Sequence, residues 1–220
     1  RLSIDKIANF YNFNCIGDYI VEISFSKKLK SMEELFNLCG DIVELDLSKV
    51  DTSKVKSMKS TFSGCVNLRN IKFDNINTSL VTDMSYMFND CHSLTSLDLN
   101  NFNTELVEDM SYMFSNTSSL QYLNVSSFNT RNVYKMQYMF YLSNLTSLDI
   151  SNFNTEKLNY MQYMFSGCNF LTSLNLSNFD TKDVVIFDGL FKGSKNLENI
   201  DIRNFYTDKM ASNKDMFEEL

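Results

Sequence analysis

Apolar residues recur along this chain in a fixed register. The segment LTSLDLNNFNTELVEDMSYMF, at residues 94–114, returns almost unchanged as LTSLDISNFNTEKLNYMQYMF at residues 145–165. The copies begin at Ile42, Leu68, Leu94, Leu120, Leu145, Leu171 and Leu197. Their starts are 26 residues apart, except for one interval of 25 between Leu120 and Leu145. Self-similarity at such a period is the signature of a solenoid, so the sequence predicts seven stacked repeats.

Each copy divides into two apolar patterns. Residues 94–99 read LxxLxL, and the last two leucines alternate onto one face of a strand. Residues 107–114 place Val, Met, Met and Phe at i, i+3, i+6 and i+7, which predicts one face of a short helix. The final phenylalanine recurs as Phe62, Phe88, Phe114, Phe140, Phe165, Phe191 and Phe217. One strand face and one helix face are therefore expected to share a core.

The predicted fold class is α/β: a leucine-rich-repeat solenoid with a curved parallel sheet on its concave side and short helices on its convex side. A single copy is too small to bury its apolar faces, so neighbouring copies must cover them. Strands stack at ~4.8 Å whereas helices need ~10 Å, and this mismatch predicts the curvature. The sheet is expected to run through Leu45, Ile71, Leu97, Leu123, Leu148, Leu174 and Ile200.

The repeats define the domain organisation. Residues 1–41 are expected to form an N-terminal cap with a shortened repeat, in which residues 3–13 are a covering helix and Ile20, Ile23 and Phe25 repeat the strand pattern. Residues 42–220 are expected to hold the seven repeats as a single continuous solenoid. The chain opens at Arg1 without an initiator Met or a signal peptide, so a fragment or a processed form is expected.

A threonine column stands at the predicted start of each helix. It comprises Thr52, Thr78, Thr104, Thr130, Thr155, Thr181 and Thr207, and Asn or Asp precedes all but the last. A side-chain oxygen at this point can accept a backbone N–H of the first helical turn, so the column predicts helix N-caps. The asparagine column is a further candidate for bonds from repeat to repeat.

Composition and charge narrow the function classes. A net charge of −7 argues against nucleic acid, which needs a concentrated basic footprint. No apolar run approaches the roughly 18 residues of a membrane span, so no membrane insertion is expected within this chain. The six glycines form no phosphate-binding loop, and His92, which follows Cys91, has no evident third partner. We therefore expect no enzyme activity, no cofactor and no metal site.

The sulfur-containing residues, cysteine and methionine, are predicted to have structural roles. Cys39, Cys65, Cys91 and Cys168 share one column, which predicts buried free thiols, with a disulfide between adjacent repeats as the alternative. The chain holds five cysteines, an odd number that counts against a complete disulfide framework. All 12 methionines fall on apolar columns and are predicted to fill the core.

The central column of the predicted sheet is the first candidate binding surface. It carries Asp46, Lys72, Asp98, Asn124, Asp149, Asn175 and Asp201. Asp on alternate repeats keeps like charges ~10 Å apart, because neighbouring strands lie ~5 Å apart. The column is either an arrangement that avoids repulsion or a mildly acidic docking strip. Tyr122 is its only aromatic neighbour, so a polar ligand such as a glycan is favoured.

Four tyrosines are the second candidate surface. Tyr86, Tyr112, Tyr138 and Tyr163 occupy one column. On a regular helix, Tyr112 would point away from the apolar face of its own repeat. The column is either a packing ladder between repeats or an outward surface for a partner or for self-association.

The repeat unit resembles the BspA-like leucine-rich-repeat surface proteins of bacteria and some protists. The resemblance rests on the pattern LxxLDLSxFxTxxVxxMxxMFxxCxxL and covers about residues 20–217. It implies display on the cell surface or secretion, adhesion to a host or matrix component, and no enzyme activity, and it assigns no site residue. We therefore expect a non-catalytic module for adhesion or protein recognition that binds a host or matrix protein or a glycan. The alternatives are an intracellular interaction scaffold or effector, and the non-catalytic targeting segment of a larger enzyme.

Overall fold

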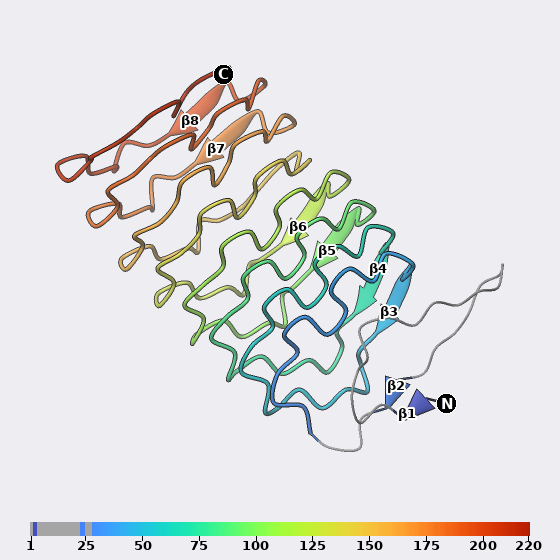
Figure 1. Cartoon of the computed structure of the whole chain (residues 1–220). Helices are drawn as coiled ribbons and strands as arrows, with labels where there is room; N and C mark the ends of the chain where they lie inside the picture. Colours follow the sequence, from blue (N-terminus) through green and yellow to red (C-terminus); the bar gives the residue numbers. More distant parts are fainter. Residues whose placement is uncertain (1, 4–22, 25–27) are drawn as a thin grey trace.

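The computed structural model shows a stack of coils, one for each sequence repeat (Figure 1). It describes residues 2–3, 23–24 and 28–220. We number the coils 1 to 7 from the repeat starts at Ile42, Leu68, Leu94, Leu120, Leu145, Leu171 and Leu197. The predicted N-terminal helix lies almost wholly outside the described residues, but Met32 and Phe36 of the shortened repeat are buried against coil 1.

Short parallel strands form one face of the stack, which we call the sheet face. The strands are β1 (Leu2–Ser3), β2 (Ile23–Ser24), β3 (Glu44–Asp46), β4 (Asn70–Lys72), β5 (Ser96–Asp98), β6 (Tyr122–Asn124), β7 (Ser173–Asn175) and β8 (Asn199–Asp201). They form parallel pairs β1–β2, β3–β4, β5–β6 and β7–β8. The register pairs Leu45 with Ile71, Leu97 with Leu123 and Leu174 with Ile200, as the sequence predicts.

The continuous sheet that the sequence predicts is interrupted between coils 2 and 3 and again on both sides of coil 5, whose start comes one residue early. Leu148 was expected in the sheet but lies in no strand. At the end of coil 3, the N–H of Leu120 bonds the carbonyl of Thr117 at 3.0 Å. This bond closes the turn that comes just before β6. Coil 4 has only Ser143 and Asn144 before Leu145, and the described structure holds no such bond at Leu145. Coil 5, which follows the short interval, is the one coil of the seven without an assigned strand.

The predicted short helices are absent, because residues 28–220 contain no helix. The segment expected to be helical is a run of turns on the opposite part of each coil, which we call the turn face. In coil 3, the N–H groups of Met113 and Ser115 bond three residues back, to Met110 and Tyr112. The alternate N–H groups bond instead to carbonyls of coil 4, which gives the pairs Met110–Lys135, Tyr112–Gln137 and Phe114–Met139 at 2.9–3.0 Å.

Backbone conformation explains why these turns do not continue as a helix. Tyr112 has φ 58° and Asn116 has φ 56°, both in the left-handed region. A positive φ at the third residue of a turn prevents continuation as a right-handed helix and turns the next N–H away. Apolar side chains three or four residues apart still face inward, so the spacing is the same as in a helix. Apolar periodicity alone therefore cannot separate the two structures.

Neighbouring coils are joined by strand-type backbone pairing on the turn face as well as on the sheet face. Single parallel bridges join Ser57, Asp83, Asp109, Lys135, Tyr160, Ile186 and Ser212 in sequence along the turn face. Backbone-bonded coils lie a strand spacing apart, ~4.8 Å. The wider helical layer that predicted an arc is therefore missing, and the physical reason for a strong curvature disappears with it.

The core consists of aligned side chains, as predicted. Eight phenylalanines stack with ring centroids 5.3–6.0 Å apart, namely Phe36, Phe62, Phe88, Phe114, Phe140, Phe165, Phe191 and Phe217. The methionines are buried with them except Met210, which lies in coil 7 and is exposed. Repetition thus converts one apolar column of the sequence into one continuous ladder.

The cysteine column contains free thiols. Cys65, Cys91 and Cys168 are buried, and Cys39 is partly buried. The thiol of Cys65 donates to the carbonyl of Phe36 at 3.1 Å, and Cys91 does the same to Phe62 at 3.2 Å. Burial raises the pKa of Cys65 to about 12, which keeps it protonated. The prediction of buried free thiols is confirmed for these residues, and Cys15 lies outside the described ones.

The threonine column joins neighbouring coils instead of capping helices. Thr104 Oγ1 donates to the carbonyl of Asn129 at 3.0 Å and accepts the N–H of the same residue at 2.8 Å. Thr104 is 1 % exposed, so these bonds replace water for two buried backbone groups. The preceding residue, Asn103, closes the local turn by accepting the N–H of Glu105. The N-cap prediction is corrected, because there is no helix to cap.

Thr104→Val is expected to destabilise the protein by about 2–4 kcal/mol, because it leaves the buried N–H and carbonyl of Asn129 without partners. Thr104→Ser keeps the hydroxyl and should cost only about 1 kcal/mol for the lost methyl group. Urea unfolding followed by tyrosine fluorescence measures both changes. A valine variant as stable as the serine variant would contradict this role of the hydroxyl.

Candidate functional site

The acidic strip lies on the sheet face, and its carboxylates partly serve the fold. Asp46, Asp98 and Asp149 are exposed, and Asp201 is partly buried. In each case Oδ1 accepts the backbone N–H two residues further on, at 3.0–3.3 Å. These bonds close the turn that follows each strand. One oxygen of each carboxylate is therefore committed to the backbone.

Strand pairing sets the order of charges along the strip. The register places Asp46 opposite Lys72, Asp98 opposite Asn124 and Asn175 opposite Asp201, which confirms the predicted alternation. The hydrogen bonds from Ser48, helped by the Lys72 charge, hold the pKa of Asp46 below its ordinary value. The pKa of Asp149 is lowered in the same way by Ser151. Asp46 and Asp149 therefore stay ionised at neutral pH, and the register keeps like charges off adjacent coils.

The interruption of the sheet opens a groove, which we call the sheet-face groove. It has a volume of about 390 Å³ and lies between β6 and the extended segment of coil 5. Tyr122 and Asp149 both line it, together with Asn124, Ser126, Ser147, Ser151 and Asn152. Tyr122 is 57 % exposed, and among the described residues Asp149 Oδ2 accepts no hydrogen bond. The structure thus brings together two of the predicted strip residues, and it leaves Asp46, Asp98 and Asp201 on other coils.

The four tyrosines form a packing ladder on the turn face. The stacked ring centroids are 4.4 Å apart for Tyr86 and Tyr112, 4.5 Å for Tyr112 and Tyr138, and 4.8 Å for Tyr138 and Tyr163. All four side chains are partly buried. Their backbones have φ of 55–58°, which is unfavourable for a bulky residue. Ring stacking between coils offsets this cost. The ladder interpretation is the one that the structure shows.

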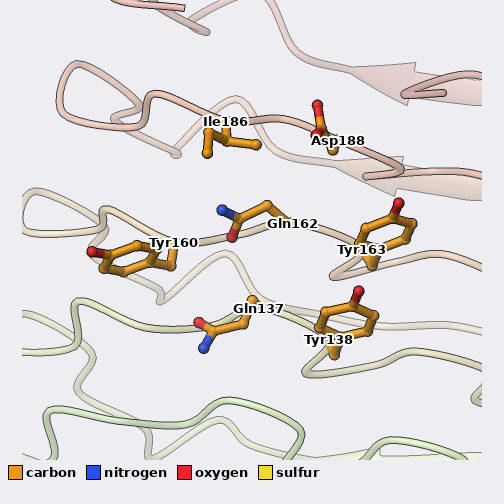
Figure 2. Close-up of a pocket in the computed structure, with 7 residues that line it drawn as sticks. All are labelled: Gln137, Tyr138, Tyr160, Gln162, Tyr163, Ile186 and Asp188. Carbon is orange, nitrogen blue, oxygen red and sulfur yellow. The ribbon is translucent and has the colours of Figure 1, made fainter. Parts of the chain in front are cut away.

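A second groove begins where the tyrosine ladder ends, and we call it the turn-face groove. Coil 6 carries Gly189 in the ladder position, and a Cβ there would lie 2.1 Å from Cε1 of Tyr163. The groove has a volume of about 370 Å³. It is lined by Gln137, Tyr138, Tyr160, Gln162, Tyr163, Ile186 and Asp188 (Figure 2). Figure 2 shows the two glutamine amides between Tyr160 on one side and Tyr138 and Tyr163 on the other.

Sequence reasoning included Tyr138 and Tyr163 but missed the other residues of the turn-face groove. These residues could have been found because they differ from the residues at the same positions of other repeats. Gln137 and Gln162 stand where coils 2 and 3 have serine, and Tyr160 and Ile186 stand where those coils have aspartate. A column-by-column search for exceptions, instead of for agreement, would have found them.

Neither groove gathers the side chains of a familiar reaction centre. His92 Nδ1 lies 3.0 Å from the carbonyl of Asn116, away from both grooves. Within residues 28–220, no cluster of His, Cys, Asp and Glu has the geometry of a metal site. Nor does the described part of the chain contain a helix able to cross a membrane. The arrangement offers hydrogen bonding and aromatic contact at two grooves.

The tyrosine ladder should be visible in a pH titration. Burial, reinforced by the neighbouring phenols, raises the pKa of Tyr112 to about 12. Its ordinary pKa is about 10, so between these values the unfolded chain is ionised while the folded one is not. Stability should therefore be complete below pH ~10 and fall as the pH rises toward 12. Phenolate absorbance should show a late phase that Tyr112→Phe reduces and that Tyr138, whose pKa burial also raises, keeps in part. Ionisation of all tyrosines near pH ~10 in the folded wild type would exclude a tightly packed ladder.

Comparison with known proteins gives one match. A family model described as "Mycoplasma protein of unknown function, DUF285" matches residues 30–147 and 120–220. No curated protein and no solved structure matches the chain. The two overlapping matches cover all seven coils, which fits a family built on this repeat. The chain therefore belongs to the DUF285 family.

Proposed function

We propose that the protein is a non-catalytic recognition module that binds a protein or glycan partner through the sheet-face groove. The observation that carries this proposal is the exposed ring of Tyr122 beside Asp149, in a groove of the sheet face at the coil that has no strand. Exposed aromatic side chains next to free polar groups are typical of binding surfaces.

The chemistry of the sheet-face groove favours a hydroxyl-rich ligand. The face of Tyr122 can pack against the C–H groups of a sugar ring, while its phenol stays in water. Asp149 Oδ2 can accept hydrogen bonds from neighbouring hydroxyls, and the pKa of this carboxyl is low enough to keep it charged. Ser126 and Ser147 add hydroxyl donors at the rim. An unpaired carboxylate with hydroxyl donors and one aromatic ring is a suitable set for a glycan.

Adhesion at the cell surface is the setting that we propose for this module. The support is the resemblance of the repeat to BspA-like surface proteins, which is compatible with membership of the DUF285 family. We extend the proposal to a displayed or secreted protein that contacts a host or matrix component. Self-association through the turn face belongs to the same proposal.

An intracellular scaffold is the second candidate function. Four free cysteines in the described residues favour it, because thiols persist without pairing in reducing compartments. Their burial makes them compatible with either setting, since buried thiols react slowly. The two candidate functions therefore differ in location and not in binding chemistry.

Tyr122→Ser and Asp149→Asn should each weaken ligand binding about tenfold, because each removes one of the two groups that converge in the groove. The assay is a glycan and matrix-protein array probed with the wild-type chain, followed by affinity measurement on each hit. Asp98→Asn is the matched control, because it makes the same change on a coil whose strand is paired. Equal binding by all four proteins would place the ligand elsewhere.

Surface display should make the protein accessible on intact cells that produce it. Protease treatment of whole cells is expected to remove it, while a cytoplasmic marker enzyme in the same sample stays intact. Loss of the protein only after lysis would favour the intracellular scaffold. The assay is immunoblotting of treated and lysed cells.

A further inference from the structure

We infer that the turn-face groove binds the guanidinium group of an arginine side chain presented by a partner polypeptide. This inference concerns a second surface and does not depend on the proposed function of the sheet-face groove. It rests on the side chains shown in Figure 2.

The floor of the groove contains two hydrogen-bond acceptors that have no partner. The Oε1 atoms of Gln137 and Gln162 are buried, and neither has a hydrogen-bond partner. In the equivalent position of coils 2 and 3, Ser85 donates to Asp83 at 2.6 Å and Ser111 donates to Asp109 at 2.5 Å. The regular repeat thus satisfies this position internally. Two buried acceptors without donors are costly unless a ligand supplies N–H or O–H groups.

Neighbouring side chains do not supply those donors. Lys135 lies two residues before Gln137. Its ammonium group points away to coil 3, where it bonds Asp109 Oδ2 at 3.1 Å. The same group also lies over the ring of Tyr134. In coil 5 the equivalent residue is Tyr160, whose ring forms a wall of the groove. In coils 4 and 5, the serine–aspartate pair of the regular repeat is therefore replaced by side chains that do not bond each other, and the glutamine oxygens remain without donors.

The charge and aromatic content of the groove favour a cation. Asp188 closes one end, and its Oδ1 accepts bonds from Ser212 and from the N–H of Lys214. Within the described residues, its carboxylate has no ion pair with lysine or arginine and Oδ2 accepts no hydrogen bond. The ring of Tyr160, which lies outside the tyrosine ladder and is 45 % exposed, adds an electron-rich face that attracts cations.

A guanidinium group meets all three requirements. It is planar, always charged and carries five N–H donors, so it can bond the Asp188 carboxylate while it lies against the Tyr160 ring, and it can bond the glutamine oxygens once their amides rotate toward the groove. A primary ammonium has fewer donors and stacks less well. The groove is open, since Tyr160 is 45 % exposed and the other lining side chains are only partly buried. A free small cation would be held by few contacts, so the partner is a polypeptide that also touches the surrounding turn face.

The test uses the whole chain and two matched probes. One is a glycine–serine peptide with a single central arginine, and the other carries citrulline, which has the same shape without the charge. Binding is followed by the NMR shifts of the side-chain amides of Gln137 and Gln162. The arginine peptide is expected to bind at least about tenfold more tightly, because bonds to charged donors are the stronger ones. Equal binding of the two peptides, or binding of neither, would overturn the proposal.

Variants locate the interaction. Asp188→Asn and the double change Gln137→Leu with Gln162→Leu should each weaken the arginine peptide about tenfold, and Gln162→Glu should tighten it. Asp98→Asn, on the sheet face, is the control and should have no effect. Melting temperature checks that each variant is folded. Unchanged affinity in the groove variants would overturn the site, and equally tight binding of N-acetylarginine amide would overturn a polypeptide partner.

Discussion

Every coil of this protein depends on backbone hydrogen bonds to its neighbours. A coil contains short strands and turns, which together satisfy only some of its own N–H and carbonyl groups. On the turn face, alternate N–H groups bond inside the coil and the rest bond to the next coil, from Met32 to Glu218. The buried threonine hydroxyls serve two further backbone groups per coil. The core ladders of phenylalanine and methionine follow from this alignment, because bonded coils place equivalent side chains above one another.

The sequence is sufficient to predict what repetition determines. The repeat length, the strand register at Leu97 and Leu123, and the buried columns all follow from apolar spacing. The helices could not be predicted correctly, because the turn and the helix share that spacing and the difference lies in the positive φ of residues such as Tyr112. A tyrosine is a poor signal for that conformation, which usually favours glycine or asparagine. Gly64, Gly167 and Asn116, in the second positive-φ column, carry the more usual signal.

Both grooves arise where the repeat departs from its own pattern. Coil 5 follows the one short interval and has no strand, and Tyr122 and Asp149 line the groove beside it. Near Gly189, the tyrosine ladder ends and glutamines replace an internally bonded serine. Regular coils use many of their polar groups on each other, and the two grooves lie where that pattern changes. The positions of Tyr122 and Asp149 could be predicted from the strip, but the sequence did not show that both would line one groove.

The two faces of the stack also differ in mechanical continuity. On the turn face, hydrogen bonds join every successive pair of coils, while the sheet face lacks strand pairing between coils 2 and 3 and on both sides of coil 5. Bending that stretches the turn face must break backbone bonds, whereas bending that opens the sheet face at these joints breaks few. The protein is therefore a rod with one stiff side. It bends more easily in the direction that opens the sheet face than in the direction that stretches the turn face. The sheet-face groove lies between two coils without strand pairing, so such a bend would widen it.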